Sequence, residues 1–242
     1  MNKHFRRIRW TGAVLALWLL ISGCRFLQTT EIGETRTITQ AVELGSARAA
    51  TVRIDMPVGE LTVKGGADGL AQATFRINAV NWEPRVDYDL NGDEGLLLVD
   101  KPNAEIPLGG ALVNQWDLQL SNAVPIDLEI DTGAGEAELD LRGLDLSGLT
   151  IETGAGSTVV DLSGTLDHDL RVTISGGVGD LSVTLPTDMG VQVSAETGIG
   201  GLTNGGLMRD GDHYVNEAFG EAAHTLYLDI SSGVGGIRLL GQ

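Results

Sequence analysis

The chain has 242 residues, with 16 Lys and Arg against 33 Asp and Glu, a formal net charge of −17 and one cysteine. A chain this acidic disfavours nucleic acid and anionic lipid headgroups as direct partners. A single cysteine excludes a disulfide framework within the chain. Its stability must therefore come from apolar burial and backbone hydrogen bonds.

The first 23 residues have the pattern of a secretory signal peptide. A basic stretch without acids precedes an apolar run from Ala13 to Ile21, and small residues follow it. This run is short for a membrane span, so cleavage is expected. The four residues ISGC, which end at Cys24, resemble a bacterial lipobox. That resemblance implies cleavage after Gly23 and lipidation of Cys24; the alternative is a signal peptide with an incidental cysteine.

Lipidation would make the protein exported and membrane-bound, on the outer face of a bacterial cytoplasmic membrane or on the outer membrane. Four of the 16 basic residues and none of the acids precede Cys24, which leaves 12 basic against 33 acidic residues and a charge of −21. The predicted organisation is a signal peptide (1–23), the lipidated Cys24 with a tether (24–45), an N-terminal β domain (46–125) and a β-solenoid (126–242).

The N-terminal β domain alternates between apolar and polar residues, which favours antiparallel strands. Phe75, Trp82 and Trp116 are its main aromatic bulk, and the turn residues from Asn91 to Gly95 predict a hairpin. The spacing of Asp89, Asn91 and Asp93 also resembles a calcium loop, but Glu94 stands where that loop needs glycine. We expect the hairpin, and a domain that caps the first coil of the solenoid.

A strand–turn–strand unit with a central glycine turn recurs five times in the solenoid region, and a sixth copy lies upstream at Gly59. The turn glycines are Gly59, Gly133, Gly135, Gly154, Gly156, Gly177, Gly179, Gly198, Gly200, Gly233 and Gly235. Aliphatic residues fall seven and five positions before the second glycine and two after it, with polar residues between them. Such alternation on both sides of a fixed turn predicts two strands per unit.

These glycines also suggest a phosphate-binding loop, but the third glycine of a dinucleotide motif is absent: Glu138 and Val159 stand there. Strands, rather than helices, follow the glycines. They are better explained as corner residues with positive φ or close backbone neighbours. The sequence predicts an all-β fold: an N-terminal antiparallel β region leading into a short, single-stack parallel β-solenoid with coils of about 21–23 residues.

Two further features of the predicted solenoid are a pair of aspartates and a segment longer than the repeat. Asp140 and Asp161 should stack on its outside, where they are either solvated or bridged by cations. The segment from Leu202 to Leu226 exceeds the repeat and contains turn signals around a short strand, so a loop there could carry something specific.

The last predicted strand offers a candidate partner edge. Ile237, Arg238, Leu239 and Leu240 lie just before the end of the printed sequence, with Leu240 on the outward side. We expect this edge to be open for strand addition unless the 202–226 segment folds over it.

Catalytic and metal-binding patterns are missing from the sequence. There is no G-x-S-x-G motif, and after residue 125 the basic residues are four arginines that fall in different coils. His168, His213 and His224 lack metal-ligand spacing and are expected at the surface or in turns. We therefore predict no catalytic residue, no metal, no cofactor, no small-molecule substrate and no nucleic-acid partner.

The residues resemble a known group of proteins. The order is a lipobox, VRIDMPVGELTVKGG, NQWDLQLSNAVPIDLEIDTGAGEAELDL and a closing YLDISSGVGGIRLL. It is similar to the bacterial toast-rack domain proteins and, through them, to adhesin domains and to the C-terminal domain of the LiaF-like cell-wall-active-antibiotic response family. This resemblance implies an envelope-facing β-solenoid without catalytic residues.

From this resemblance and the lipobox we expect a non-catalytic lipoprotein that makes structural or adhesive contacts, by self-association or with an envelope protein. The alternative is an accessory protein of an envelope stress response; an enzyme on polysaccharide is a third hypothesis. The lipid anchor in place of membrane-spanning helices separates the chain from the antibiotic-response proteins.

Overall fold

The computed structural model describes residues 31–101 and 111–241. The strands there are β1 (Ile32–Val42), β2 (Ala49–Ala67), β3 (Ala71–Ala79), β4 (Arg85–Asn91), β5 (Glu94–Asp100), β6 (Asn114–Ser121), β7 (Ile126–Asp140), β8 (Leu146–Asp161), β9 (Leu170–Val178), β10 (Leu181–Leu185), β11 (Gly190–Ile199), β12 (Leu202–Thr203), β13 (Met208–Asp210), β14 (His213–Val215), β15 (Thr225–Val234) and β16 (Ile237–Gly241). The predicted all-β fold is confirmed. Within these ranges, no helix is long and apolar enough to cross a membrane.

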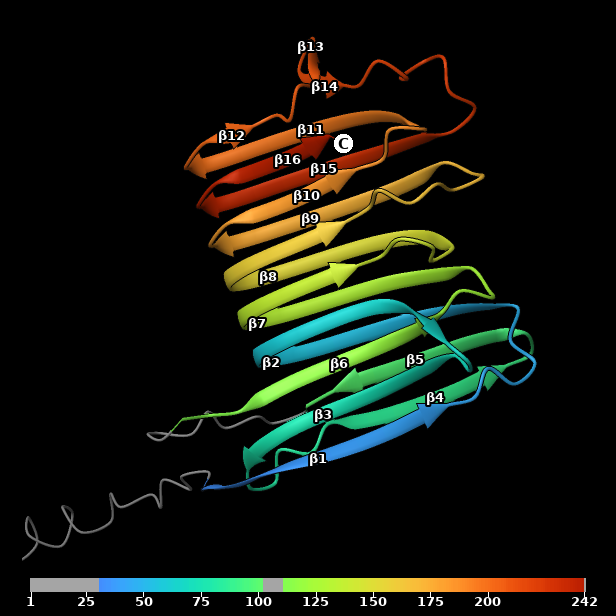
Figure 1. Cartoon of the computed structure of the whole chain (residues 1–242), viewed down its shortest axis with the longest axis vertical. Coiled ribbons are helices and arrows are strands. Elements are labelled where there is room, and N and C mark those ends of the chain that lie inside the picture. Colours follow the sequence, from blue (N-terminus) through green and yellow to red (C-terminus); the bar gives the residue numbers. More distant parts are fainter. Residues whose placement is uncertain (1–30, 102–110, 242) are drawn as a thin grey trace, which may run out of the picture.

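The strands form a rack of coils stacked one above another (Figure 1). Each coil crosses one face, turns at the glycines and returns across the other face. β2, β7 and β8 run through this bend without a break, whereas the later coils divide there into β9 and β10, β15 and β16, and β11 and β12. Pairing between the coils is parallel. The predicted single-stack parallel solenoid is therefore confirmed.

The core lies between the two faces and follows the predicted columns. Seven positions before the turn glycine, residues in register across six coils are at most 2% exposed: Val52, Leu128, Leu149, Val172, Leu228 and Val193. Period-two alternation sends the residues between them outward. Because no single coil can bury its own apolar face, burial depends on the neighbouring coils.

Antiparallel pairs lie at the N-terminal end of the rack, but the 46–125 region is not the separate antiparallel domain that was expected: its β2 is the first coil of the stack and pairs parallel with β5, β6 and β7. β5 and β6 lie parallel to the two halves of β2. β4 pairs with β5, and β1 and β3 extend the face of β6. Phe75 and Trp116 meet edge to face with ring centroids 5.4 Å apart, and both are buried. β1 begins at Ile32, inside the range expected to be a tether.

The coils are not stacked in chain order. β15 lies between β9 and β11, parallel to both, and β16 lies between β10 and β12. The last coil of the chain thus fills a slot that the coil of β11 and β12 leaves beside β9 and β10 (Figure 1). Every coil has the same register pattern. The sequence periodicity is therefore compatible both with stacking in chain order and with the observed order, in which β15 and β16 are inserted.

This insertion makes the predicted open edge at Ile237–Leu240 wrong. β16 pairs with β10 along its whole length, and on its other side Ile237 and Arg238 pair with Leu202 and Thr203. The turn that contains Gly205 packs against Leu239 and Gly241. The 202–226 segment therefore covers this edge. Leu240 does point outward and is 40% exposed.

The same segment caps the far end of the rack over a short stretch. β14 pairs antiparallel with β11 at Gln192 and Val193 only, and β13 pairs with β14. Asn216 fixes the return of the chain: its Nδ2 donates to the Met189 carbonyl (2.8 Å), and its Oδ1 accepts from the Val191 amide (2.9 Å). The rest of β11 has β15 as its only paired strand in the described chain.

Candidate functional surfaces

The glycine-turn edge is built from backbone alone. Gly135, Gly156 and Gly179 have φ of 138°, 136° and 142°, a region that favours glycine. A Cβ at any of them would also overlap the carbonyl oxygen of the turn glycine in the neighbouring coil. The structure places all the predicted turn glycines on this edge. Positive φ and close approach are both present at the second glycine of each turn.

A line of apolar side chains projects from this edge, one from the position just before each positive-φ turn glycine. In spatial order the residues in register are Val58, Ala134, Ala155, Val178, Val234 and Ile199. The two alanines of the middle coils give way to larger side chains at the far end, where Val178, Val234 and Ile199 are 56%, 43% and 72% exposed. Sequence analysis missed this surface, although the apolar residue before the second turn glycine of each unit indicates it.

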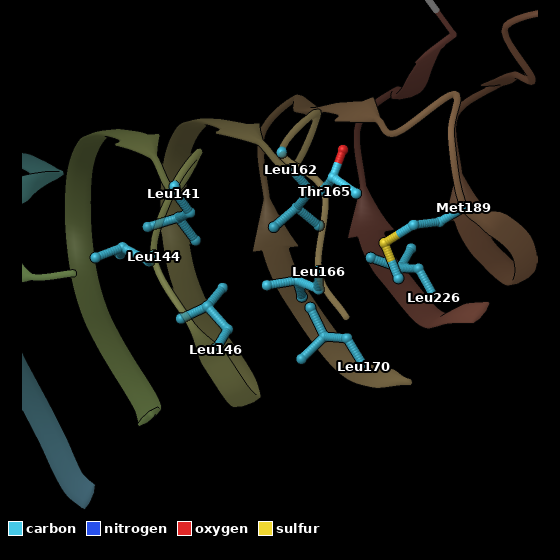
Figure 2. Close-up of a pocket in the computed structure, with 11 residues that line it drawn as sticks. Leu141, Leu144, Leu146, Leu162, Thr165, Leu166, Leu170, Met189 and Leu226 are labelled. Carbon is cyan, nitrogen blue, oxygen red and sulfur yellow. The ribbon is translucent and has the colours of Figure 1, made fainter. Parts of the chain in front are cut away.

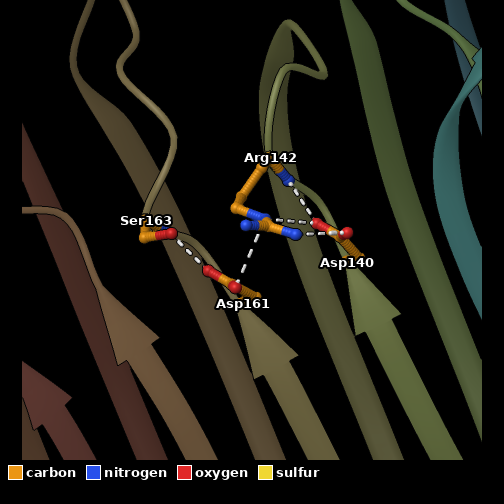
Figure 3. Close-up of polar contacts among 4 residues, drawn as sticks. All are labelled: Asp140, Arg142, Asp161 and Ser163. Atoms are coloured by element: carbon orange, nitrogen blue, oxygen red, sulfur yellow. Dashed lines mark hydrogen bonds and ion pairs between the residues drawn. The ribbon is translucent and has the colours of Figure 1, made fainter. Parts of the chain in front are cut away.

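Asp140 and Asp161 stack in register, and the chain supplies its own cation between them (Figure 3). Arg142 donates from Nε and Nη2 to the two carboxylate oxygens of Asp140, each at 2.8 Å, and its Nε lies 3.4 Å from Asp161 Oδ2. The hydrogen bond from Arg142 lowers the pKa of Asp140 below its usual range. The column is therefore bridged by a guanidinium, which sequence analysis did not foresee.

A second carboxylate column crosses the other face near the N-terminal end. Asp55 lies opposite Asp100 on one side and Asp131 on the other, and Asp131 lies opposite Glu152. Burial, then the charges of Asp131 and Asp100, raise the pKa of Asp55. Arg85 binds Asp100 through two hydrogen bonds of 2.9 and 2.6 Å. Among the described residues, no group of three or more His, Cys, Asp or Glu is arranged to hold a metal ion.

His168 lies in a turn and ties two coils together. Its Nε2 is 2.9 Å from the Leu146 carbonyl oxygen, which can only accept, and its Nδ1 is 3.2 Å from Asp167 Oδ1. The bond to Leu146, then the one to Asp167, raises the pKa of His168. His213 is exposed on β14. The predicted surface and turn positions of these two histidines agree with the structure.

One cavity among the described residues is too small for a ligand. At the edge opposite the glycine turns, a cavity lined by leucines, Met189 and Thr165 has about 10 Å³ open to the centre of a water molecule (Figure 2). That is about the minimum for one water, and the lining is mostly apolar. Two larger hollows, of about 400 and 450 Å³, are open depressions on the surface. None of these spaces resembles a substrate pocket.

Three of the four arginines after residue 125 make contacts in separate places. Arg142 holds Asp140, Arg171 lies over the Tyr227 ring at 5.5 Å, and Arg209 donates to the Gly211 carbonyl. A polysaccharide lyase needs carboxylates and a basic proton acceptor at one site. In the described chain, these arginines do not converge on a carboxylate cluster within a cleft.

Comparison with known proteins places this geometry in a family. A family model described as the N-terminal domain of toast_rack, DUF2154, matches residues 31–184. The chain belongs to the toast-rack family. A second model, cell wall-active antibiotics response LiaF, C-terminal, matches residues 134–239 of this toast-rack protein. The resemblance to toast-rack proteins and to the LiaF-like C-terminal domain that was inferred from the sequence is thus confirmed.

One solved structure shares the fold of this chain, and a second gives a much weaker match. A crystal structure described as a putative cell adhesion protein from Clostridium sporogenes ATCC 15579 has a TM-score of 0.83 and 26% identity, and it covers 86% of this chain and 100% of that one. A structure described as a putative adhesin from Bacteroides fragilis NCTC 9343 has a TM-score of 0.35 and 13% identity, with 85% and 97% covered. No curated protein matches.

The predicted lipidation site, Cys24, lies outside the described residues.

Proposed function

We propose that this toast-rack protein is a non-catalytic cell-envelope lipoprotein that displays its solenoid for structural or adhesive contacts. The observation that carries the proposal is the match to the Clostridium protein over its whole length, at 26% identity and a TM-score of 0.83. That protein is described as a putative cell adhesion protein. A contact role needs a stable surface, and the stacked coils of the rack supply one.

Export and anchoring rest on the sequence. The signal-peptide pattern and the lipobox-like ISGC support cleavage after Gly23 and acylation of Cys24. The acyl chains would hold the domain at a bilayer surface, with about 0.8 kcal/mol gained per buried CH₂. The protein would then contact the membrane through the lipid on Cys24.

The outward faces support contact with another molecule. They are parallel β surfaces on which Asp, Glu, Ser and Thr alternate with the buried columns. Val159 is an exception: it points outward on β8 and is 47% exposed. A mature charge of −21 favours partners with cationic groups over other acidic surfaces.

The test is photo-crosslinking in the native host, with Cys24 intact and a photoreactive residue at Val159. A self-crosslink, or a product with an envelope matrix component, supports the structural or adhesive function. A matched probe at Val52, which is buried, controls for contacts made during unfolding. The absence of any product specific to Val159 would contradict a contact function for this face.

A second function has a specific observation in its favour. The match of residues 134–239 to the C-terminal domain of LiaF supports an accessory role in an envelope stress response. This alternative predicts one stoichiometric protein partner. A single heterologous product in the same crosslinking experiment would favour it over adhesion.

A further inference from the structure

The far end of the glycine-turn edge carries a compact aliphatic cluster. It consists of Val178, Val234 and Ile199, which are adjacent in register on β9, β15 and β11. We call it the tip cluster. Nine large hydrophobic residues of the described chain are exposed, and these three lie side by side with 43–72% exposure. Scattered exposed aliphatics need no explanation, but a contiguous group at a protruding edge marks a contact surface.

The surroundings of the tip cluster are almost free of charge. Each of the three residues stands between two glycines, and the turns of Val234 and Ile199 continue with a further glycine, Gly236 and Gly201. The nearest acid along the chain is Asp180, whose Oδ1 accepts a hydrogen bond of 2.8 Å from the Gly236 amide. On a chain this acidic, the tip cluster is a local exception. Because it carries no charge, the free-energy cost of transferring it out of water is low.

The chain enters the rack on this same edge. Ile32, at the start of β1, pairs with Ala79, and β3 pairs with β6 so that Ile77 lies opposite Asn114. Asn114 in turn packs against Gly59, the first of the turn glycines. Figure 1 shows β1 starting on the side where β2, β7 and β8 bend. The N-terminal tether therefore leaves from the glycine-turn edge.

The length of the tether limits how far this edge can be from a membrane. Eight residues, 24–31, separate the start of the mature chain from Ile32, and they span at most about 28 Å. From β6 to β12 the stack has six steps, about 29 Å at the spacing of neighbouring strands. A rack lying with this edge on the bilayer would place the lipid at one end of the edge and the tip cluster near the other.

We propose that the tip cluster inserts into the interfacial zone of the bilayer that holds the Cys24 lipid. This proposal rests on the lipid anchoring put forward above. The lipid keeps the protein on the membrane, and the tip cluster sets its orientation: the stacking axis lies along the bilayer. Both polar faces then stand free for contacts. An apolar tip within reach of a tethered bilayer has lipid as its nearest apolar environment.

Depth-dependent quenching of tryptophan fluorescence tests the orientation. The mature chain keeps two tryptophans, Trp82 and Trp116, both buried, which give a constant background. Val234→Trp places a third in the tip cluster, and Val159→Trp is the matched control, an exposed valine on a face. Each full-length mature protein is reconstituted into neutral phosphatidylcholine vesicles that contain brominated acyl chains. We expect the Val234→Trp signal to be quenched at least about twofold more than the Val159→Trp signal.

Equal quenching of the two variants would overturn the proposal. So would a Val234→Trp signal that is shielded from aqueous iodide but unaffected by brominated lipid, because a protein partner would then occupy the tip cluster. Flotation of the vesicles reports lipid anchoring separately. If Cys24 carries no acyl chain, its thiol is coupled to a maleimide lipid, which restores the tether. The quenching comparison then decides on the tip cluster, whatever the outcome for natural acylation.

Discussion

The two edges of the rack close the same coils by different means. At the glycine-turn edge the backbones of neighbouring coils touch, and six second glycines share φ between 136° and 156°. At the opposite edge the connections differ in length and conformation, and leucine side chains fill the space between them (Figure 2). Backbone contact imposes one geometry on every coil, whereas side-chain packing tolerates variety. The regular edge therefore allows a repeating surface, and the irregular edge absorbs the insertion of the last coil.

The largest effect is expected where the backbones touch. Gly156→Ala puts a Cβ on the Gly135 carbonyl and forces alanine to a φ of 136°. The loss of unfolding free energy should be about 4 kcal/mol or more, because neither backbone can move without breaking the register. Gly206→Ala is the control: its φ is 86°, but nothing lies within 4 Å of the added Cβ.

Urea unfolding followed by far-UV circular dichroism measures both variants. Gly206→Ala should cost only about 1 kcal/mol, from backbone strain. Equal losses in the two variants would show that close approach between coils is unimportant, and would remove the distinction between the edges.

A smaller loss is expected at the side-chain edge. Leu170→Ala removes a 1% exposed side chain from the wall of the leucine-lined cavity. The transfer and cavity contributions together should lower the unfolding free energy by about 3 kcal/mol. Leu240→Ala, at a leucine that is 40% exposed, should change it by less than about 1 kcal/mol. Chemical denaturation gives both values, and a Leu170→Ala variant as stable as the Leu240→Ala variant would refute a packed edge.

His168 gives the side-chain edge a pH dependence. Its pKa is raised in the folded chain by the Leu146 carbonyl and by Asp167. A raised pKa stabilises the fold fully below the unfolded pKa, and this contribution is lost as pH rises through the folded value. His168→Gln should therefore lower the urea midpoint more at about pH 5.5 than at about pH 8.5. His213→Gln, in the exposed hairpin, is the control; a deficit that grows with pH would contradict the assignment.

The smallest effect is expected at the outer face. Arg142→Gln removes the cation between Asp140 and Asp161 and leaves two carboxylates in register. The melting temperature of Arg142→Gln should fall by less than that of Leu170→Ala. The difference in melting temperature between the wild type and Arg142→Gln should shrink in about 1 M salt, which screens the charges. Because the pKa of Asp140 is lowered, the contribution of the pair is present above the unfolded pKa and disappears as pH falls through the folded one. Arg209→Gln is the control, and a salt-independent loss would argue against a charge effect.

The sequence predicted the register of the rack but not the order of its coils. The columns that contain Leu149 and Val172 were readable because alternation and a fixed glycine determine which residues share a level. The placement of β15 between β9 and β11 could not be predicted. Ile230 occupies the same column as Ile174 and Ala195, so the pattern does not say which coil lies beside which. Spatial order depends on how the 202–226 segment crosses the end of the stack, and no local pattern encodes that path.

The candidate surfaces divide in the same way. The turn glycines were predicted from their spacing and explained by positive φ or close backbone neighbours, and the structure shows both at Gly135, Gly156 and Gly179. The bridge made by Arg142 was missed because it joins residues of two coils through a side chain in the turn between them. The predicted edge at Ile237–Leu240 failed because the last strand in sequence was taken as the last strand in space.

The most direct test of a lipid-anchored rack is the intact mass of the protein purified from the membranes of its host. Lipidation predicts a chain that begins at Cys24, lacks the first 23 residues and carries the added mass of a diacylglyceryl group. A Cys24→Ser variant should lose this mass and leave the membrane fraction. A wild-type chain that retains its first 23 residues, or that begins at residue 24 without added mass and stays in the soluble fraction, would contradict the proposed anchoring.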